Sequence, residues 1–342
     1  MKPETPTTIG FLLFPGFPMS CLTSAIDALR VANEIAGAQV FDWSLIADGG
    51  GKVVSSARVG FETEQALDRV ARLDYLFLLS GPDGQFATSS AGRGRLRHLA
   101  RHGVTIGAIS GGVFPLARTG LLDGFTASVH WCYRAAFEAD FPGVDRSNAV
   151  LVIDRTRQTA SGAAAGFDLM LHLIGDRLGA EVATETACWF QHPMIRGPGV
   201  RQRVPTLHAD STTDTVPGPV RHAIDLLTDH IGETISIAEV ADRLHMSQRQ
   251  LERRFKSTTG QSPSAYYRML RMSAARQLLR HSVRPITDIA QEVGCATPSQ
   301  LSRQYRSVYG LTPVEDRRVR RGIRVDAAAP APAPSPTGCG AA

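Results

Sequence analysis

A near repeat in the last third of the sequence limits the fold more than any other feature. The stretch ISIAEVADRLHMSQRQLERRFKSTTGQSP, which starts at Ile235, matches RPITDIAQEVGCATPSQLSRQYRSVYGLTP, which starts at Arg284. Each copy predicts a short helix, a tight turn and a second helix that begins after a capping Ser247 or Thr297. One extra residue in the second turn shifts the alignment. The chain therefore contains two copies of one helical hairpin.

The two helices of each copy bury one face against each other and leave another face open. Apolar residues at helical spacing, such as Leu251 and Leu301, fill the shared face. Side chains near the start of the second helix then point outward. In helix-turn-helix proteins, Arg and Gln at these positions pair with guanine and adenine. We predict that the base-reading side chains are Arg249, Gln250, Arg253, Ser299, Gln300 and Arg303. The alternative is a helical hairpin repeat that binds no DNA.

The segment between the copies, residues 262–282, reads as one continuous helix. A helix of about 18 to 20 residues is roughly 27 to 30 Å long, since each residue adds about 1.5 Å. That length would set the two second helices about one turn of DNA, roughly 34 Å, apart. One chain would then contact two tandem half-sites in successive major grooves of double-stranded DNA.

The positive charge of the chain lies in the same part. Residues 218–324 contain 18 Lys and Arg against 10 Asp and Glu, a balance of +8, whereas residues 1–217 contain 19 against 21, a balance of −2. A concentrated positive charge favours nucleic acid or another anionic surface. We expect Arg254, Lys256 and Arg306 to contact phosphates, which adds affinity without sequence information.

Residues 217–321 resemble the DNA-binding domain of the AraC/XylS regulators. The run A-x-x-L-x-M-S-x-R-x-L-x-R-x-F from Ala241 to Phe255 and the G-x-x-P segments at Gly260 and Gly310 carry the resemblance. It implies a seven-helix, all-α domain with two helix-turn-helix motifs, and it points to the same base readers. Pro298, at the first helical position of its helix, offers no N–H donor. We therefore expect the second motif to read bases less strongly.

The first two thirds of the chain read as an α/β sandwich. Short apolar segments, several of them rich in Val, Ile and Phe, alternate with helical stretches. This pattern is typical of a mainly parallel sheet with helices on both faces. The expected strands are residues 9–14, 41–47, 75–80, 104–109 and 149–153, and the expected helices are residues 20–33, 93–101, 113–119 and 164–178.

One strand of this predicted sheet ends in GAISGG, residues 107–112. A strand that enters a helix through such small residues has the form of a nucleophile elbow, in which backbone amides point at an anion. Ser110 occupies the nucleophile position. A serine hydroxyl is a far poorer nucleophile than a thiolate unless a base activates it and a third group orients that base.

Residues 9–198 resemble the PfpI-like branch of the class I glutamine amidotransferase-like fold, a flavodoxin-like α/β sandwich. FLLFPGF at the first strand, the elbow, and VHW at residues 129–131 carry the resemblance. Enzymes of that superfamily usually have a cysteine at the elbow, a histidine nearby and often a glutamate from the first loop. The matching residues here are Ser110, His130 and Cys21. No motif places the nearest acids, Asp27 and Asp123, beside His130. The resemblance therefore implies a degenerate elbow in a protein that is not an enzyme.

Taken together, the two parts resemble the GlxA-type transcription regulators, several of which control the catabolism of small amines and amino acids. LARTGLLDG at residues 116–124 and GFDLMLHLIG at residues 166–175 are further segments of that family. The resemblance implies a transcription activator whose elbow binds an amino acid, a betaine or another amine. Cys132 stands where such members commonly have glutamate. The expected effector-binding residues are Ser110, Gly111, Gly112, His130, Trp131 and Phe17. Phe14 is a further aromatic candidate.

Other features set the expected boundaries and compartment. We expect residues 1–8 and the Ala/Pro-rich residues 325–342 to be disordered, residues 199–217 to be a linker, and residues 218–324 to bind DNA. Five scattered cysteines without a C-x-x-C pair predict no disulfide framework, metal site or cofactor. Without a run of about 18 apolar residues or a signal peptide, we expect a cytoplasmic protein that binds no membrane.

The remaining expectations concern partners and alternatives. The resemblance implies a homodimer, and an activator would also contact RNA polymerase. One alternative is a working Ser-His hydrolase or amidase of the PfpI-like kind with a DNA-binding appendage. Another alternative is a DNA-bending protein that responds to no ligand.

Overall fold

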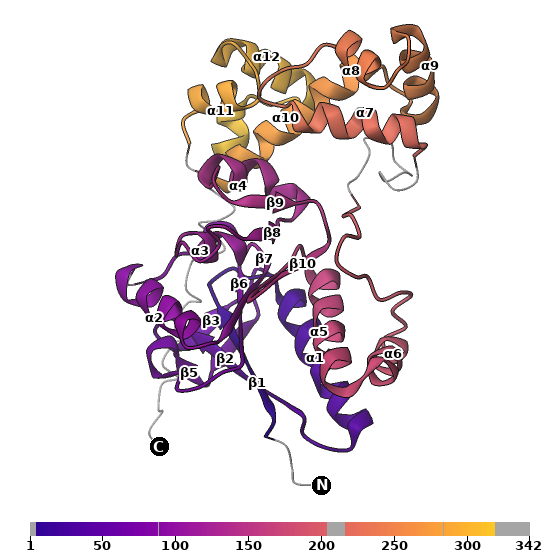
Figure 1. Cartoon of the computed structure of the whole chain (residues 1–342). Helices are drawn as coiled ribbons and strands as arrows, with labels where there is room; N and C mark the ends of the chain where they lie inside the picture. Colours follow the sequence, from indigo (N-terminus) through magenta and orange to yellow (C-terminus); the bar gives the residue numbers. More distant parts are fainter. Residues whose placement is uncertain (1–4, 88, 204–215, 283, 319–342) are drawn as a thin grey trace, which may run out of the picture.

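The computed structural model describes residues 5–87, 89–203, 216–282 and 284–318. It contains an α/β domain followed by an all-helical domain (Figure 1). This arrangement confirms the predicted fold class. Residues 1–4, residues 204–215 of the expected linker and the Ala/Pro-rich tail lie outside the described residues.

A seven-stranded sheet organises the α/β domain. Its strands, with those of two small sheets, are β1 (Thr7–Leu13), β2 (Phe41–Ala47), β3 (Gly51–Val54), β4 (Gly60–Thr63), β5 (Gln65–Ala66), β6 (Tyr75–Ser80), β7 (Thr105–Ser110), β8 (Thr126–Ser128), β9 (Asp145–Ser147), β10 (Leu151–Asp154) and β11 (Arg157–Ala160). The order is β10-β11-β7-β6-β1-β2-β5, and only β10 with β11 is antiparallel. β3 pairs with β4 and β8 with β9.

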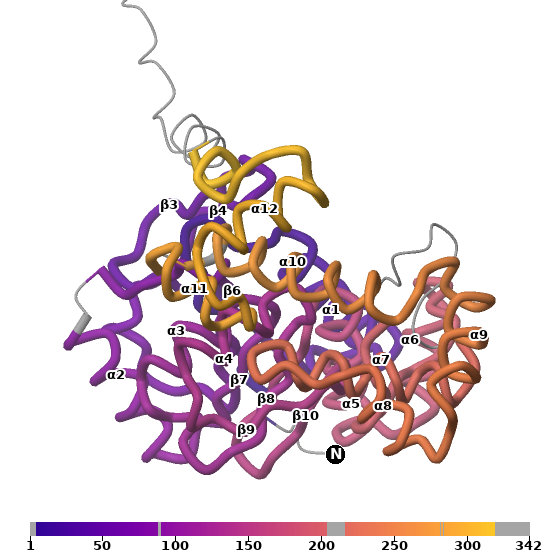
Figure 2. Tube along the Cα trace, turned by 90° about the horizontal axis from the view of Figure 1, so that it is seen from above, coloured from indigo at the N-terminus to yellow at the C-terminus, as the bar shows by residue number. Residues whose placement is uncertain are grey.

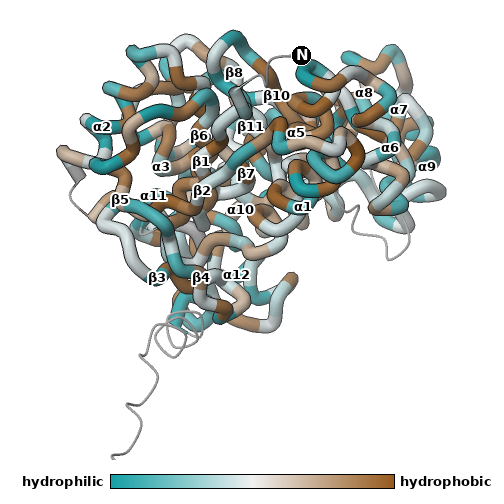
Figure 3. The backbone as a smooth tube through the Cα atoms, turned by 90° about the horizontal axis from the view of Figure 1, so that it is seen from below, coloured by the Kyte–Doolittle hydropathy of each residue, from teal (hydrophilic) through white to brown (hydrophobic). Residues whose placement is uncertain are grey.

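Helices cover both faces of this sheet. α1 (Met19–Ala36), α5 (Ala163–Leu178) and α6 (Ala180–Trp189) pack on one face, and α2 (Ser89–Arg101), α3 (Val113–Ala117) and α4 (Arg134–Asp140) lie on the other. Because side chains alternate along a strand, Phe11 packs in the core beneath α1, α5 and α6, whereas Leu12 packs in the core on the opposite face of the sheet. The apolar stretches of β1, β6 and β7 therefore run through the middle of the domain (Figure 3).

The sequence analysis missed several elements, and β11 shows why. This strand reads RQTA, yet it pairs with β7 inside the sheet, and Arg157 and Gln158 are buried. The Arg157 Nε donates to the carbonyl of Leu121 at 2.7 Å. The side chains of this strand are polar although they are buried, so the strand carries no apolar run that could reveal it. The helices α4 and α6 were also not predicted.

Two expected boundaries need correction. β1 begins at Thr7, inside the range 1–8 that was expected to be disordered, because the Thr8 N–H and hydroxyl donate to Asp74 at 2.8 and 2.9 Å. The first residues of the expected linker 199–217 belong to the α/β domain. The Gln202 side chain is buried and donates to the carbonyls of Val129 and Ala149, so the domain extends past residue 198.

The helical domain is built around one long helix. Its elements are α7 (Gly218–Asp229), α8 (Ile237–Arg243), α9 (Gln248–Thr259), α10 (Pro263–His281), α11 (Ile286–Glu292), α12 (Pro298–Tyr309) and the helical residues 313–318. α8 and α9 pack with α7 around Val240 and Phe255, and α11 and α12 pack around Ile289 and Tyr305. The two copies of the repeat thus lie toward the two ends of α10 (Figure 2).

Candidate DNA-binding surface and effector site

The second helix of the first copy, α9, is fixed at both ends. Ser247 caps its start, since the Ser247 Oγ accepts from the Gln250 N–H at 3.3 Å and the Gln250 Oε1 accepts from the Ser247 N–H at 3.0 Å. Gly260 ends the helix in the left-handed conformation, with φ 73°. The buried Leu251 and Phe255 hold the helix to α8 and α7. The remaining face is free to meet a partner.

The second copy is built in the same way around α12. The Thr297 Oγ1 accepts from the Gln300 N–H at 3.2 Å, Pro298 is the first helical residue, and Gly310 ends the helix at φ 74°. The turn before α12 needs Gly294, which has φ 66° and whose added Cβ would lie 2.6 Å from Thr234 and 2.9 Å from a backbone oxygen. Both copies therefore form helix-turn-helix units, as the repeat predicts.

The outer faces of α9 and α12 carry exposed cations. All six predicted positive side chains are exposed, and none forms a salt bridge within the described residues; they are Arg249, Arg253, Arg254, Lys256, Arg303 and Arg306. Ser299 is exposed beside them. Cations that the protein leaves uncompensated can bind phosphates and base edges.

The two glutamines predicted to read bases also form hydrogen bonds at the starts of their helices. The Gln250 Oε1 accepts from Ser247 at the start of α9, and the Gln300 Oε1 accepts from the Ala296 N–H at 2.9 Å at the start of α12. A bidentate pair with adenine needs both the Oε1 and the Nε2 of a glutamine. Only the Nε2 donors remain open in this arrangement, so full adenine pairing would require the caps to open.

One rigid spacer separates the two units. α10 has 19 residues, which correspond to about 28 Å at about 1.5 Å per residue. Asp316 holds the second unit to this spacer, because it accepts from the Arg276 Nε at 2.8 Å and from the Tyr305 hydroxyl at 2.5 Å. α9 and α12 lie on the side of the helical domain away from the α/β domain (Figure 1). That side is open to a duplex.

The elbow in the α/β domain has the strained backbone that the sequence predicts. Ser110 ends β7 with φ 56°, a left-handed conformation that is uncommon for a residue with a side chain. The two residues after it must be glycines. A Cβ on Gly111 would lie 2.5 Å from the carbonyl oxygen of Ser80, and one on Gly112 would lie 2.0 Å from that of Leu78. Ser110 itself is 6% exposed.

Neutral polar groups surround Ser110. The Cys21 thiol and the Tyr133 hydroxyl both lie within hydrogen-bonding reach of its side chain. Burial raises the pKa of Cys21, of Cys132 and of Tyr133 to about 12, so all three are protonated at neutral pH. The sequence analysis placed Cys21 at the elbow through the resemblance and missed Tyr133. The only sequence signal that could have indicated Tyr133 was its position two residues after Trp131.

His130 is not arranged as a base for Ser110. Its Nδ1 accepts from the Cys132 N–H at 3.2 Å, and burial lowers its pKa, which keeps the imidazole neutral. Within the described residues no hydrogen bond joins it to Ser110. Neither nearby acid orients it, since Asp27 pairs with Arg30 and Asp123 is exposed. The geometry thus lacks the orienting contacts of a catalytic triad.

The predicted aromatic residues do not meet at the elbow. Phe17 and Phe14 are both buried, and they pack edge to face on Phe61 and Phe86, with ring centroids 5.5 and 5.1 Å apart. The structure therefore places Phe17 in the core. Trp131 is half-buried, and its ring lies 5.5 Å from that of His130. The backbone N–H of Trp131 donates to the Gln202 Oε1 at 2.9 Å, a contact that sequence reasoning could not predict.

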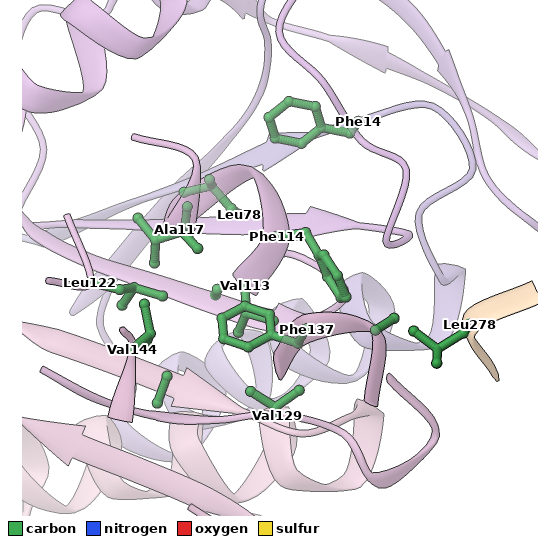
Figure 4. Packing of buried hydrophobic residues seen from close by; sticks show 14 of the residues in the cluster. Phe14, Leu78, Val113, Phe114, Ala117, Leu122, Val129, Phe137, Val144 and Leu278 are labelled. Carbon is green, nitrogen blue, oxygen red and sulfur yellow. The ribbon is translucent and has the colours of Figure 1, made fainter. Parts of the chain in front are cut away.

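The short helix α4 connects the elbow region to the helical domain. α4 follows the 3₁₀ turn Trp131–Tyr133 and packs against α10. At one end Arg134 pairs with Asp229 of α7 at 3.1 Å, and at the other end Asp140 pairs with Arg284, just before α11, at 3.6 Å. Leu278 of α10 joins the apolar cluster around Phe137 (Figure 4). The two domains therefore share part of their core.

The fold and these two surfaces define a two-domain transcription regulator, with AraC-type helix-turn-helix units and an α/β domain that carries a degenerate elbow. A family model described as a helix-turn-helix domain matches residues 240–319. The HTH-type transcriptional regulator GbdR of Pseudomonas aeruginosa is 34% identical over 314 residues, which are 92% of this chain and 85% of GbdR. GlxA of Rhizobium meliloti is 30% identical over 311 residues, 91% and 95% of the two chains. The chain belongs to this GlxA and GbdR type of AraC-family, DNA-binding transcription regulators.

Solved structures agree with this assignment. An AraC family transcriptional regulator from Pseudomonas putida superimposes with a TM-score of 0.50 and 25% identity, over 54% of this chain and all of that chain. A ThiJ/PfpI family protein from Pseudomonas syringae has a TM-score of 0.50 and 23% identity, over 70% of this chain and 91% of its own. The second match confirms the predicted PfpI-like fold.

The described residues offer neither a metal site nor a membrane span. In the part that the structure describes, no group of three or more His, Cys, Asp and Glu side chains could hold a metal ion. No helix there is long and apolar enough to cross a membrane.

Proposed function

We propose that the chain is a cytoplasmic transcription activator that reads two tandem half-sites and responds to a small effector at the elbow. The observation that carries this proposal is the pair of exposed, salt-bridge-free arginine faces toward the ends of one 19-residue helix. Arg249 and Arg253 read bases from α9, and Ser299 and Arg303 read bases from α12. Gln250 and Gln300 contribute their Nε2 donors. Arg254, Lys256 and Arg306 contact phosphates.

The effector proposal rests on the chemistry around Ser110. The Ser110 and Tyr133 hydroxyls and the Cys21 thiol are donors, and Gly111 brings a backbone N–H group to the same turn, whereas the Gly112 N–H already donates to the Ile109 carbonyl at 3.1 Å. None of these groups is a carboxylate. Such a set suits the carboxylate of an amino acid or a betaine, and Trp131 beside His130 offers an aromatic face to its ammonium group. The elbow acts as a binding site and catalyses no reaction.

The effector acts through α4 on the spacing or orientation of the two DNA-binding units. Two copies of the chain form a dimer on the operator, and the activator contacts RNA polymerase there. A ligand shifts such an equilibrium only as far as it binds the two arrangements with different affinity. The contacts of α4 with α7, α10 and Arg284 supply elements that can differ between the arrangements.

The DNA proposal is tested with the double variant Arg253→Ala/Arg303→Ala on an operator selected from random DNA. We expect a loss of at least about 30-fold in operator affinity, because each good base contact contributes about 1 to 3 kcal/mol. Binding to random DNA falls much less. The control is Arg69→Ala/Arg101→Ala, which removes the same charge from exposed positions of the α/β domain. Unchanged preference for the operator in the test variant would refute the base-reader assignment.

The elbow proposal is tested by melting the full chain with a panel of amino acids, betaines and amines. A ligand at 100 times its Kd raises stability by about 2.7 kcal/mol, which a thermal shift detects. We expect one member to stabilise the protein, and we expect Ser110→Ala to remove the shift while Ser56→Ala, an exposed control, keeps it. Turnover of amides or esters that Ser110→Ala abolishes would instead support the hydrolase. A panel without any shift would favour the ligand-independent DNA-bending protein.

A further inference from the structure

A cavity lies between the two domains, and Trp131 of the proposed effector site forms part of its lining. It has a volume of about 320 Å³. Trp131 and α4 line it from the α/β domain, and α7 and α10 line it from the helical domain. Leu278 of α10 also borders this cavity. Figure 4 shows it beside buried residues of the α/β domain. Sites for small molecules often lie at domain interfaces and begin at about this size.

Four carboxylates and three arginines line this cavity, and one of these arginines is not part of an ion pair among the described residues. Four carboxylates line it, and each has an arginine partner at 2.7 to 3.1 Å; the pairs are Asp225 with Arg201, Asp229 with Arg134, Glu138 with Arg146, and Glu292 with Arg284. Arg221 also lines the cavity but has no carboxylate partner among the described residues. Its Nη2 donates to the Val216 carbonyl at 3.1 Å, and its Nε is buried without a partner.

A second unused donor faces the same cavity. Tyr266 lines it and is only 1% exposed, yet its hydroxyl has no hydrogen-bond partner within the described ranges. Burial raises the pKa of this hydroxyl to about 12, which keeps it protonated and able to donate. This hydroxyl can donate to a ligand that supplies an acceptor, and hydrogen bonds to a charged acceptor are the stronger ones. The Tyr266 ring packs edge to face on Phe255 of α9, with centroids 5.1 Å apart.

We propose that this interdomain cavity binds a small carboxylate with an apolar body. The carboxylate accepts hydrogen bonds from the Arg221 guanidinium and the Tyr266 hydroxyl. The body of the ligand lies against Trp131, Ile224 and Leu270, which line the same space. This site shares Trp131 with the effector site proposed at the elbow, but its polar groups, Arg221 and Tyr266, belong to the helical domain. A ligand here contacts both domains, and it therefore stabilises the docked arrangement in which Tyr266 supports α9.

Three probes with one body and different head groups test the proposal on the full chain by calorimetry. The probes are 4-phenylbutyrate, 4-phenylbutan-1-ol and 4-phenylbutylamine. We expect the carboxylate to bind at least about tenfold more tightly than the alcohol, since hydrogen bonds to charged groups are the stronger ones. The amine, which meets an unpaired cation, should bind least. Equal affinity for the three probes, or no binding of the carboxylate up to about 10 mM, would overturn the proposal.

Variants then locate the site. Tyr266→Phe removes only the hydroxyl, and Arg221→Met keeps most of the side-chain length without the charge. Each should weaken 4-phenylbutyrate binding by about tenfold. Arg268→Met, an exposed change on α10, is the charge-matched control and should leave the affinity as it was. Ser110→Ala should also leave it unchanged. Loss of binding in Ser110→Ala but in neither cavity variant would assign the probe to the elbow and refute the cavity site.

Discussion

Gln250 and Gln300 each combine a capping role with a proposed base-reading role. Each accepts a backbone hydrogen bond at the start of its helix through its Oε1, and each is also a proposed base reader. Capping contributes about 1 kcal/mol to a helix. A base contact that breaks the cap must first offset that amount. The base-reading arginines do not cap a helix, so they supply most of the sequence discrimination that we propose.

The thiols near the elbow should be unreactive in the folded protein. In a Cys188→Ser/Cys339→Ser background, which removes the exposed Cys188 and the tail cysteine, we expect Ellman's reagent to modify the native chain slowly at about pH 8. Burial raises the pKa of Cys21 and Cys132 to about 12, and the thiolate is the reactive form. The rate should climb about tenfold per pH unit below that pKa.

The control for this experiment is the same protein in denaturing urea, where the thiols should react at once. A native rate at neutral pH as fast as the unfolded one would show a thiolate at the elbow. That result would reopen the question of covalent chemistry there.

At the scale of elements, the sequence predicts what repetition and apolar pattern determine. The helix-turn-helix copies, the spacer helix and the strands with apolar runs are all in place. β11 was missed because its polar residues are satisfied only by neighbours such as Leu121, which the sequence cannot place beside it. The elbow was predicted because the small residues of GAISGG determine the backbone conformation of this turn. Tyr133 and Gln202 were missed because their contacts join segments that are distant in sequence or carry no motif.

The elbow's glycine requirement gives a stability prediction. Gly112→Ala forces a methyl group to 2.0 Å from the Leu78 carbonyl oxygen, and backbone cannot move aside cheaply. We expect the free energy of unfolding to fall by about 1 to 3 kcal/mol, the usual cost of overpacking. Urea denaturation measures it. Gly143→Ala is the matched control, because nothing lies within 4 Å of its added Cβ. An equal effect of the two changes would contradict the close packing of the elbow.

At the scale of the whole molecule, the spacer makes operator spacing a sharp requirement. A 5 bp insertion between the half-sites turns the second one to the opposite side of the duplex. A 10 bp insertion restores the side but doubles the distance, since a turn takes about 10 to 10.5 bp. A helix of about 28 Å cannot span two turns. We expect both insertions to lose the affinity of the second half-site, as measured by fluorescence anisotropy.

The 10 bp insertion is the informative case. A flexible connection between the two units would tolerate it, whereas α10 with its Arg276 and Asp316 anchor would not. Full affinity for that operator would show that the two units move independently.

The position of α4 has a consequence for the cell. Because this helix contacts α7, α10 and Arg284 and directly follows the turn that carries Trp131 and Tyr133, a change transmitted through it to the helical domain can also be transmitted back. Reciprocity requires operator DNA to change the protein's affinity for the proposed effector by the same factor as the effector changes its affinity for DNA. A regulator bound at its promoter would then respond to a different effector concentration than a regulator that is not bound to its operator.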